Sequence, residues 1–144
     1  MHNLVFVSLH GNVIEISNKL FHKNNFFLKY LNKFCGYFVP RNDNKVNVWL
    51  TVGLYSNHNL MVYNKMDKAF IVIYEPSMDG EFWNNLKKSY QQLKKISKNI
   101  SMISLNVKKI EQKKYLLKWC IEHDNMQFIE IEEKDGISLN NLEF

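Results

Sequence analysis

The chain has 144 residues, of which 46% are hydrophobic, 14% aromatic and 23% charged, and its formal net charge is +5. This composition predicts one globular domain spanning residues 1–144 and excludes a disordered chain, while no apolar run approaches the roughly 18 residues of a membrane span. Arg41 is the only arginine among 19 basic residues; because specific nucleic-acid sites rely on arginine, we expect no nucleic-acid partner.

The two cysteines, Cys35 and Cys120, lie far apart in the sequence and lack the spacing of metal ligands. We interpret them as free thiols in a reducing compartment, so the chain is expected to be cytoplasmic, and its N-terminus does not have the architecture of a signal peptide. The histidines show neither His-x-x-x-His nor HExxH spacing. We therefore expect no metal site and no catalytic residue.

The first predicted elements are a strand and a helix. "NLVFV" at residues 3–7 is a short apolar run that fits a buried strand. Residues 13–31 are predicted to be helical at least at their start, because Ile14, Phe21 and Leu28 are spaced in sevens.

Three strands are predicted next. "GYFV" at residues 36–39 and "VNVWL" at residues 46–50 flank "PRNDNK", whose Pro, Asn and Asp favour a turn. "AFIVIYEP" at residues 69–76 is the strongest strand of the chain, because a run of β-favouring residues is stopped by a proline.

Two helix–strand units complete the chain. Residues 81–96 and 110–124 are predicted amphipathic helices, followed by strands in residues 100–107 and 126–133. The positions expected to face the core are Phe82, Leu86, Tyr90, Leu93 and Ile96 in the first helix, and Leu116, Leu117, Cys120 and Ile121 in the second. This alternation predicts a three-layer α/β fold with a mostly parallel sheet.

The segment "VNVWLTVGLYSNHNL" carries a resemblance to a known family. Trp49, Thr51 and Gly53 match the strand and switch segment that ends in WDTAGQ, the signature of small GTPases of the Ras superfamily. The sequence departs from that signature at Leu50, Val52 and Leu54. Its later segments "AFIVIYEPS", "ISMISLNVKK" and "KWCIEHDNMQFIEIEEKDG" follow the family order of strands and helices, and the Rab branch is the most similar.

The resemblance implies a Ras-like G-domain topology whose final helix is short or missing. Only "ISLNNLEF" follows Gly136, and there is no C-terminal Cys for a prenyl anchor. Either the chain is truncated, or a partner protein covers the sheet face where that helix would pack. "KWCIEHDNMQFIEI" also resembles the corresponding unit of the Rab-like domain in alpha- and gamma-adaptin-binding protein.

Residues Asn64–Asp67 spell NKxD, the tetrapeptide with which GTPases read guanine. In the family order this NKMD precedes the central strand, where it could not read a base. The expected reading position is residues 106–109, where Asn106 is kept and Lys109 replaces the Asp. A lysine donates hydrogen bonds only, so it cannot accept the donors of guanine.

The phosphate loop is also degenerate. In the corresponding residues 8–15 only Gly11 remains of the glycines, Ile14 occupies the lysine position, and Glu15 occupies the position of the Mg²⁺ ligand. A carboxylate about 4 Å from a phosphate costs about 4 kcal/mol at an effective dielectric constant near 20, and the missing lysine forfeits a similar amount. Together these changes remove roughly six decades of affinity.

The remaining nucleotide positions are altered as well. Leu50 stands at the carboxylate that reaches Mg²⁺, Leu54 at the glutamine that positions water, and Glu132 at the start of the SAK motif. We therefore expect no bound nucleotide or other cofactor. We further expect Ile14, Leu50 and Leu54 to fill the former phosphate pocket.

The hypothesis that follows is a Rab-like pseudo-GTPase that serves as a protein-interaction module or complex subunit in intracellular membrane traffic. Its partners would be one or more proteins, with no direct membrane anchor. The candidate interaction residues are Tyr55, His58, Met61, Tyr63, Lys87 and Lys94. Two alternatives stay open: an atypical but active small GTPase that binds GTP or GDP, and a basic nucleic-acid-binding module.

Overall fold

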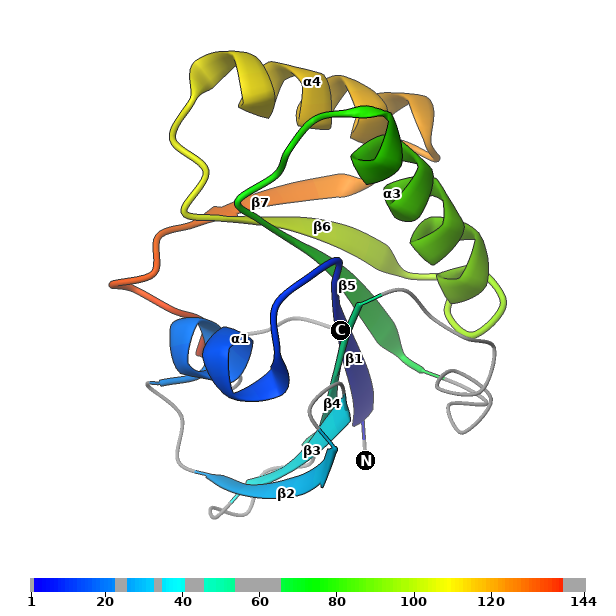
Figure 1. Cartoon of the computed structure of the whole chain (residues 1–144). Coiled ribbons are helices and arrows are strands. Elements are labelled where there is room, and N and C mark those ends of the chain that lie inside the picture. The colour runs from blue at the N-terminus through cyan, green and yellow to red at the C-terminus, as the bar shows by residue number, and fades with distance from the viewer. Residues whose placement is uncertain (1, 23–25, 33–34, 41–45, 54–65, 139–144) are drawn as a thin grey trace.

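A computed structural model describes the chain in residues 2–22, 26–32, 35–40, 46–53 and 66–138. These residues form one sheet of seven strands with helices on both sides (Figure 1). The strands are β1 (His2–Ser8), β2 (Phe26–Asn32), β3 (Cys35–Pro40), β4 (Val46–Val52), β5 (Lys68–Tyr74), β6 (Ile100–Leu105) and β7 (Gln127–Ile131). The helices are α1 (Val13–Leu20), α3 (Gly80–Leu93) and α4 (Ile110–Glu122).

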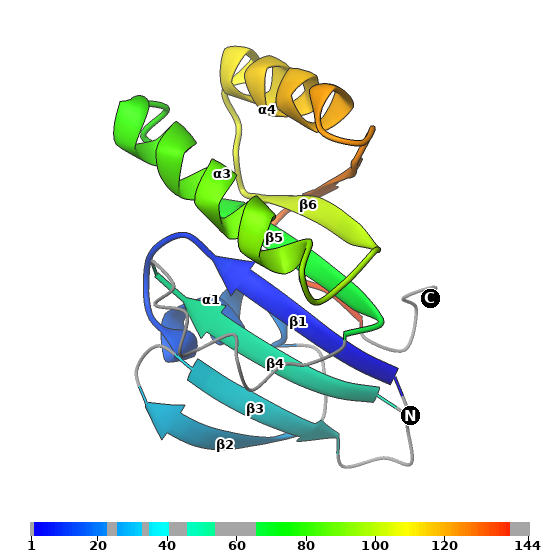
Figure 2. The same cartoon turned by 90° about the vertical axis from the view of Figure 1, so that its right-hand side faces the viewer.

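The strand order is β2-β3-β4-β1-β5-β6-β7. The strands β4, β1, β5, β6 and β7 run parallel to one another, whereas β3 pairs antiparallel with both β2 and β4. The predicted α/β fold with a mostly parallel sheet is confirmed. Its three layers are visible when the molecule is turned: α3 and α4 cover one face of the sheet, and α1 lies against the other (Figure 2).

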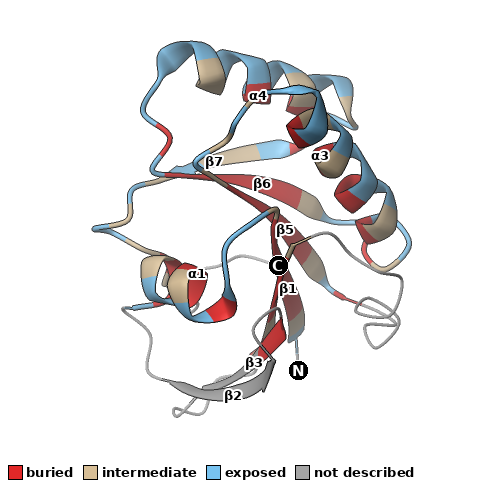
Figure 3. Ribbon diagram, viewed as in Figure 1, coloured by how far each residue is buried: buried red, intermediate tan, exposed pale blue. Residues whose placement is uncertain are grey.

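The central strands are apolar on both sides because helices cover both faces. In β1, Val5 and Val7 belong to the core under α3 and α4, whereas Leu4 and Phe6 belong to the core under α1. Side chains alternate between faces along a strand, so one short run supplies both cores. The burial pattern shows this sandwiching directly, with the sheet almost entirely buried in its centre (Figure 3).

Helix α3 begins where the sequence provides a cap. The Asp79 side chain accepts a hydrogen bond from the backbone N–H of Phe82 at 2.8 Å, which satisfies one of the free donors of the first turn. The predicted apolar stripe is buried, although the helix ends at Leu93 rather than at Ile96.

The prediction that residues 13–31 are helical at least at their start is confirmed, but the helix covers only the first part of this range. Helix α1 ends at Leu20, and Leu28 lies in strand β2. The spacing of apolar residues in sevens was misleading because α1 buries Val13, Ile16 and Leu20 instead, leaving Ile14 46% exposed.

Helix α4 also faces the core differently from the prediction. Leu116 and Cys120 are buried, as expected, but Leu117 is 44% and Ile121 58% exposed. The reason is its position, since α4 covers β6 and β7 at one margin of the sheet and has a neighbour on one side only (Figure 1).

The sheet face beside α1 is not open at its centre. Val72, Ile103 and Leu105 are fully buried there, and Ile137 packs into the same core while its N–H donates to the Leu20 carbonyl at 2.7 Å. The core beside α1 thus already covers the centre of β5 and β6, and the expectation that a partner covers the remainder of this face stays a prediction. The residues in which a final helix would continue, 139–144, lie outside the described residues.

Both cysteines are buried free thiols, as predicted. Burial raises the pKa of the Cys120 thiol to about 12, so it does not act as a nucleophile near neutral pH. Among the described residues, no helix is long and apolar enough to cross a membrane, and no group of His, Cys, Asp and Glu could hold a metal ion.

Candidate functional site

The carboxyl ends of the parallel strands form the edge where open α/β sheets bind ligands. The segments that follow β1, β5, β6 and β7 meet this edge, as does Gly53 at the end of β4. They include most of the positions that the sequence analysis assigned to a degenerate nucleotide site. The geometry of each loop determines whether that edge could still hold a phosphate and a base.

The loop between β1 and α1 is closed by its own hydrogen bonds. The Ser8 hydroxyl donates to the His10 carbonyl at 2.8 Å, and the Asn12 side chain accepts from the Glu15 N–H at 2.9 Å. Gly11 has a positive φ of 99°, and a Cβ placed on it would lie 3.3 Å from the Ile16 side chain. An N–H group that a phosphate loop would offer to its ligand is thus bonded within the chain.

No lysine occupies the phosphate position in this loop. Ile14 is 46% exposed, so the prediction that it fills the pocket is wrong, whereas Glu15 is half-buried in the first turn of α1. A carboxylate at this end of a helix occupies the place where an anionic ligand would otherwise be favoured.

The lysine of α1 is engaged elsewhere. The Lys19 Nζ lies 2.9 Å from the Glu133 carboxylate and 5.0 Å from the centre of the Tyr74 ring. The hydrogen bond to Glu133 is the largest of the interactions that raise the Lys19 pKa, and burial raises the pKa of Tyr74. Lys19 therefore ties α1 to the segment after β7.

Leu50 is fully buried in the core beside α1. That it fills a former phosphate pocket stays a prediction. Gly53 follows the end of β4, and its N–H donates to the Ser8 carbonyl at 2.9 Å. The third expected filler, Leu54, lies outside the described residues.

A cavity of about 360 Å³ lies at the ends of β6 and β7. Asn106 lines it with a φ of 57°, and its N–H donates to the Ile131 carbonyl at 2.8 Å. Lys109 is exposed at the start of α4, where it provides no side-chain cap. The charged side chains that line the cavity are Lys108, Lys113, Glu130, Glu132 and Asp135.

These charges do not make an anion site. The Lys113 Nζ lies 3.5 Å from the Glu130 carboxylate, and Glu132 lies 3.2 Å from the Lys134 Nζ. Two lysines face three carboxylates in the lining, so the field in the cavity is mixed rather than positive. Glu132, which the resemblance places at the start of the SAK motif, thus forms an ion pair with Lys134.

Ser104 is a cavity residue that sequence reasoning missed. Its hydroxyl is buried and has no hydrogen-bond partner among the described residues. A water molecule is the ordinary partner of such a group in a polar cavity. A serine inside an apolar strand gives no sequence signal of this kind.

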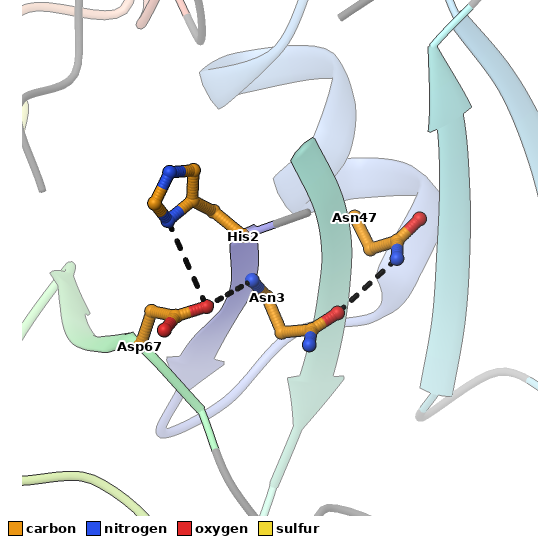
Figure 4. A network of polar contacts seen from close by, with 4 residues as sticks. All are labelled: His2, Asn3, Asn47 and Asp67. Atoms are coloured by element: carbon orange, nitrogen blue, oxygen red, sulfur yellow. Dashed lines mark hydrogen bonds and ion pairs between the residues drawn. The ribbon is translucent and has the colours of Figure 1, made fainter. Parts of the chain in front are cut away.

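Asp67, the last residue of the NKMD tetrapeptide, has a structural role at the opposite edge of the sheet; Asn64 and Lys65 lie outside the described residues. Asp67 precedes β5, and its carboxylate accepts a hydrogen bond from the Asn3 N–H at 2.6 Å (Figure 4). The same carboxylate lies 3.9 Å from His2, and the Asn47 amide donates to the Asn3 side chain at 3.1 Å. Asp67 thus joins the amino ends of β1 and β5, far from the ligand edge.

The candidate interaction residues are only partly placed. Lys87 is exposed on α3, but Lys94 is occupied, with its Nζ 3.2 Å from the Asp124 carboxylate and 5.3 Å from the centre of the Tyr90 ring. Tyr55, His58, Met61 and Tyr63 lie outside the described residues.

A second cavity, of about 480 Å³, lies where α3 and α4 end. The buried Tyr90 hydroxyl donates to the Asp124 carboxylate, and Trp119 stacks on His123 with ring centres 3.8 Å apart. Burial, with the bond to Asp124, raises the pKa of Tyr90 to about 12. Because these groups satisfy one another, we interpret the cluster as a clasp between the two helices.

No protein-family model matches the chain, and no characterised protein matches it significantly in sequence. The inference of function therefore rests on the geometry of the loops and on the resemblance of the motifs.

Proposed function

We propose that this chain is a Rab-like pseudo-GTPase domain. It has lost nucleotide binding and serves as a protein-interaction module or complex subunit in intracellular membrane traffic. The strand order supports a Ras-like topology: once the edge strand β2 is set aside, the order is β3-β4-β1-β5-β6-β7, with β3 alone antiparallel. That is the order expected of a Ras-like domain, and β2 is an addition to it.

The observation that carries the proposal is the closed loop between β1 and α1. Asn12 caps the helix, Glu15 places a carboxylate in its first turn, and Ile14 offers no charge. A phosphate that bound here would have to break the hydrogen bond from the Glu15 N–H to the Asn12 side chain. It would also be repelled by the Glu15 carboxylate, and no lysine in the loop would offset its charge. Each of these changes weakens binding in a site that depends on free N–H groups and positive charge.

The base-reading side supports the same conclusion. Lys109, at the start of α4, stands where the resemblance places the guanine-reading carboxylate, and Glu132 is paired with Lys134. A lysine only donates hydrogen bonds, so Lys109 cannot accept the two N–H donors of a guanine edge as an Asp at that position would.

The loss of nucleotide binding favours a role in which the chain binds other proteins. Small GTPases switch partners because the γ-phosphate holds mobile loops in place. A chain that binds no γ-phosphate would lack this means of switching, so we propose that its partners bind it independently of a nucleotide. Leu50, buried at the former metal position, removes the group that would sense Mg²⁺.

The direct test is the nucleotide content of the purified chain. We expect no stoichiometric GDP or GTP when the protein is denatured and the supernatant is chromatographed, with an active small GTPase purified in parallel as the control. Stoichiometric GDP would overturn the proposal and favour an atypical GTPase.

A further inference from the structure

Helix α4 carries an apolar stripe on its outer side. Ile110 is 70% exposed, Leu117 44% and Ile121 58%, and together they occupy positions i, i+7 and i+11. At about 100° per residue these side chains fall within an arc of about 40°. Tyr115, although 60% exposed, lies on a different side of the helix. Figure 3 shows the outer side of α4 as mostly exposed.

The stripe borders a groove between α4 and β7. A hollow of about 360 Å³ is lined by Ile110, Lys113, Lys114, Leu117, Phe128 and Glu130. Strand β7 ends the sheet and pairs only with β6 within the described ranges, so no further strand of that part of the chain closes the groove. Phe128 is half-buried and provides an apolar wall.

The charges beside this groove are mostly positive. Lys114, at i+4 from Ile110, lies about 20° beyond the edge of the arc, and it forms no ion pair with any residue that the structure describes. Lys113 is paired with Glu130, and Lys118 lies 3.9 Å from Glu122. The two residues before the helix, Lys108 and Lys109, add further positive charge.

This charge pattern distinguishes between possible occupants. A second copy of the chain, docked through the same stripe, would bring a second set of the same lysines into one interface, and like charges in an interface are costly. A partner segment with acidic residues beside an apolar face would pair with the same lysines. The helical spacing of the stripe matches the packing of one helix against another.

We propose that the α4–β7 groove, lined by Ile110, Lys114, Leu117 and Phe128 and continued along α4 by the exposed Ile121, is the docking site for an acidic amphipathic helix of a partner protein. The partner places its apolar face on the stripe and its carboxylates beside Lys114 and Lys118. This inference rests on the proposed function in one respect, namely that the chain is a protein-interaction module.

The test uses two synthetic peptides of about 18 residues, long enough to be helical when bound. Both carry leucines at helical spacing on one face; the flanks are glutamates in one peptide and lysines in the other. Fluorescence anisotropy measures their binding to the full chain. We expect the glutamate peptide to bind more tightly than the lysine peptide, and Leu117→Glu to weaken its binding at least about tenfold.

Two further variants make the test specific. Tyr115→Glu adds the same charge at an exposed site of α4 outside the stripe, and it should leave the affinity unchanged. Lys114→Glu should weaken the binding of the glutamate peptide and strengthen the binding of the lysine peptide. All three variants change exposed residues, so circular dichroism should show an unchanged fold.

Three outcomes would overturn the inference. The first is no preference for the glutamate peptide, and the second is equal weakening by Leu117→Glu and Tyr115→Glu. The third is a dimer in sedimentation that Leu117→Glu dissolves, which would make a second copy the occupant. Bound nucleotide would refute the pseudo-GTPase proposal without changing these results, so the two failures are distinguishable.

Discussion

The Asn12 side chain accepts a hydrogen bond from a backbone N–H at the start of α1, so this donor is not free to bind a ligand. Its carboxamide oxygen lies 2.9 Å from the Glu15 nitrogen, and its own carbonyl accepts from Ile16 at 3.0 Å. A helix that binds phosphate leaves such donors free for the ligand. Here the cap stabilises the fold instead.

Asn12→Ala should lower the free energy of unfolding by about 1 kcal/mol, because the first turn of α1 loses its cap. The midpoint of urea unfolding measures this change. The matched control is Asn18→Ala, an exposed position in the middle of the same helix, where alanine should be neutral or slightly stabilising. Equal losses in both variants would contradict the assigned role of Asn12.

At this scale the sequence shows residue identities better than where the side chains lie, and the loss of nucleotide contacts stays a proposal. The presence of Lys109, Glu15 and Leu50 at the positions that the resemblance assigns to those contacts could be recognised from residue identity alone. The exposure of Ile14 and the orphan hydroxyl of Ser104 could not, because both depend on how α1 and α4 dock on the sheet. Similarly, the role of Asp67 requires β1 and β5 to be neighbours.

The elements were predictable where local signals agreed with packing. Helix α3, with an Asp79 cap and one apolar stripe, and the strand ending before Pro76 are examples. Strand β2 was missed because the apolar spacing continued the pattern of α1 past its end at Leu20. Of the α4 residues predicted to face the core, only Leu116 and Cys120 are buried. The periodicity of the helix does not show how much of its surface the sheet covers.

Leu116 and Leu117 provide a test of this facing. Leu116→Ala should lower the free energy of unfolding by about 2–5 kcal/mol, because it leaves a cavity between α4 and the sheet, where Leu116 is fully buried. Leu117→Ala should cost much less, because that side chain is 44% exposed. Thermal or urea unfolding measures both, and a Leu117→Ala loss as large as that of Leu116→Ala would refute the orientation of the helix.

The clasp between α3 and α4 should respond to pH on both sides. The pKa of Tyr90 is raised to about 12, so its contribution to stability is present below about pH 10 and is lost as the pH rises towards 12. The pKa of Asp124 is lowered, first by the Tyr90 hydrogen bond, so its contribution is lost as the pH falls through that lowered value.

Tyr90→Phe isolates this contribution. The variant should be about 1 kcal/mol less stable near pH 7, because the bond to Asp124 is lost. Its stability should also fall less steeply than that of the parent chain between about pH 10 and about pH 12. Urea unfolding at several pH values measures both effects, and parallel pH profiles for the two proteins would contradict the raised pKa.

At the scale of the whole molecule, the loops of the candidate site, the Asp67 contacts and the apolar stripe of α4 lie at separate margins of one sheet. The degenerate loops lie at the carboxyl ends of the strands, Asp67 lies at the opposite edge, and the apolar stripe of α4 lies beside β7. The sequence predicted the α/β class because buried strands and amphipathic helices alternate clearly. The groove was not predicted, because only tertiary structure shows that Leu117 and Phe128 line one hollow.

The central claim, that nucleotide binding has been lost, is tested most directly by titrating the purified chain with a fluorescent GTP analogue in the presence of Mg²⁺. We expect no binding up to about 100 μM, because the loop after β1 offers neither a lysine nor a free capping position. Binding in the micromolar range, competed by unlabelled GTP, would contradict the account and show that the chain is an atypical GTPase.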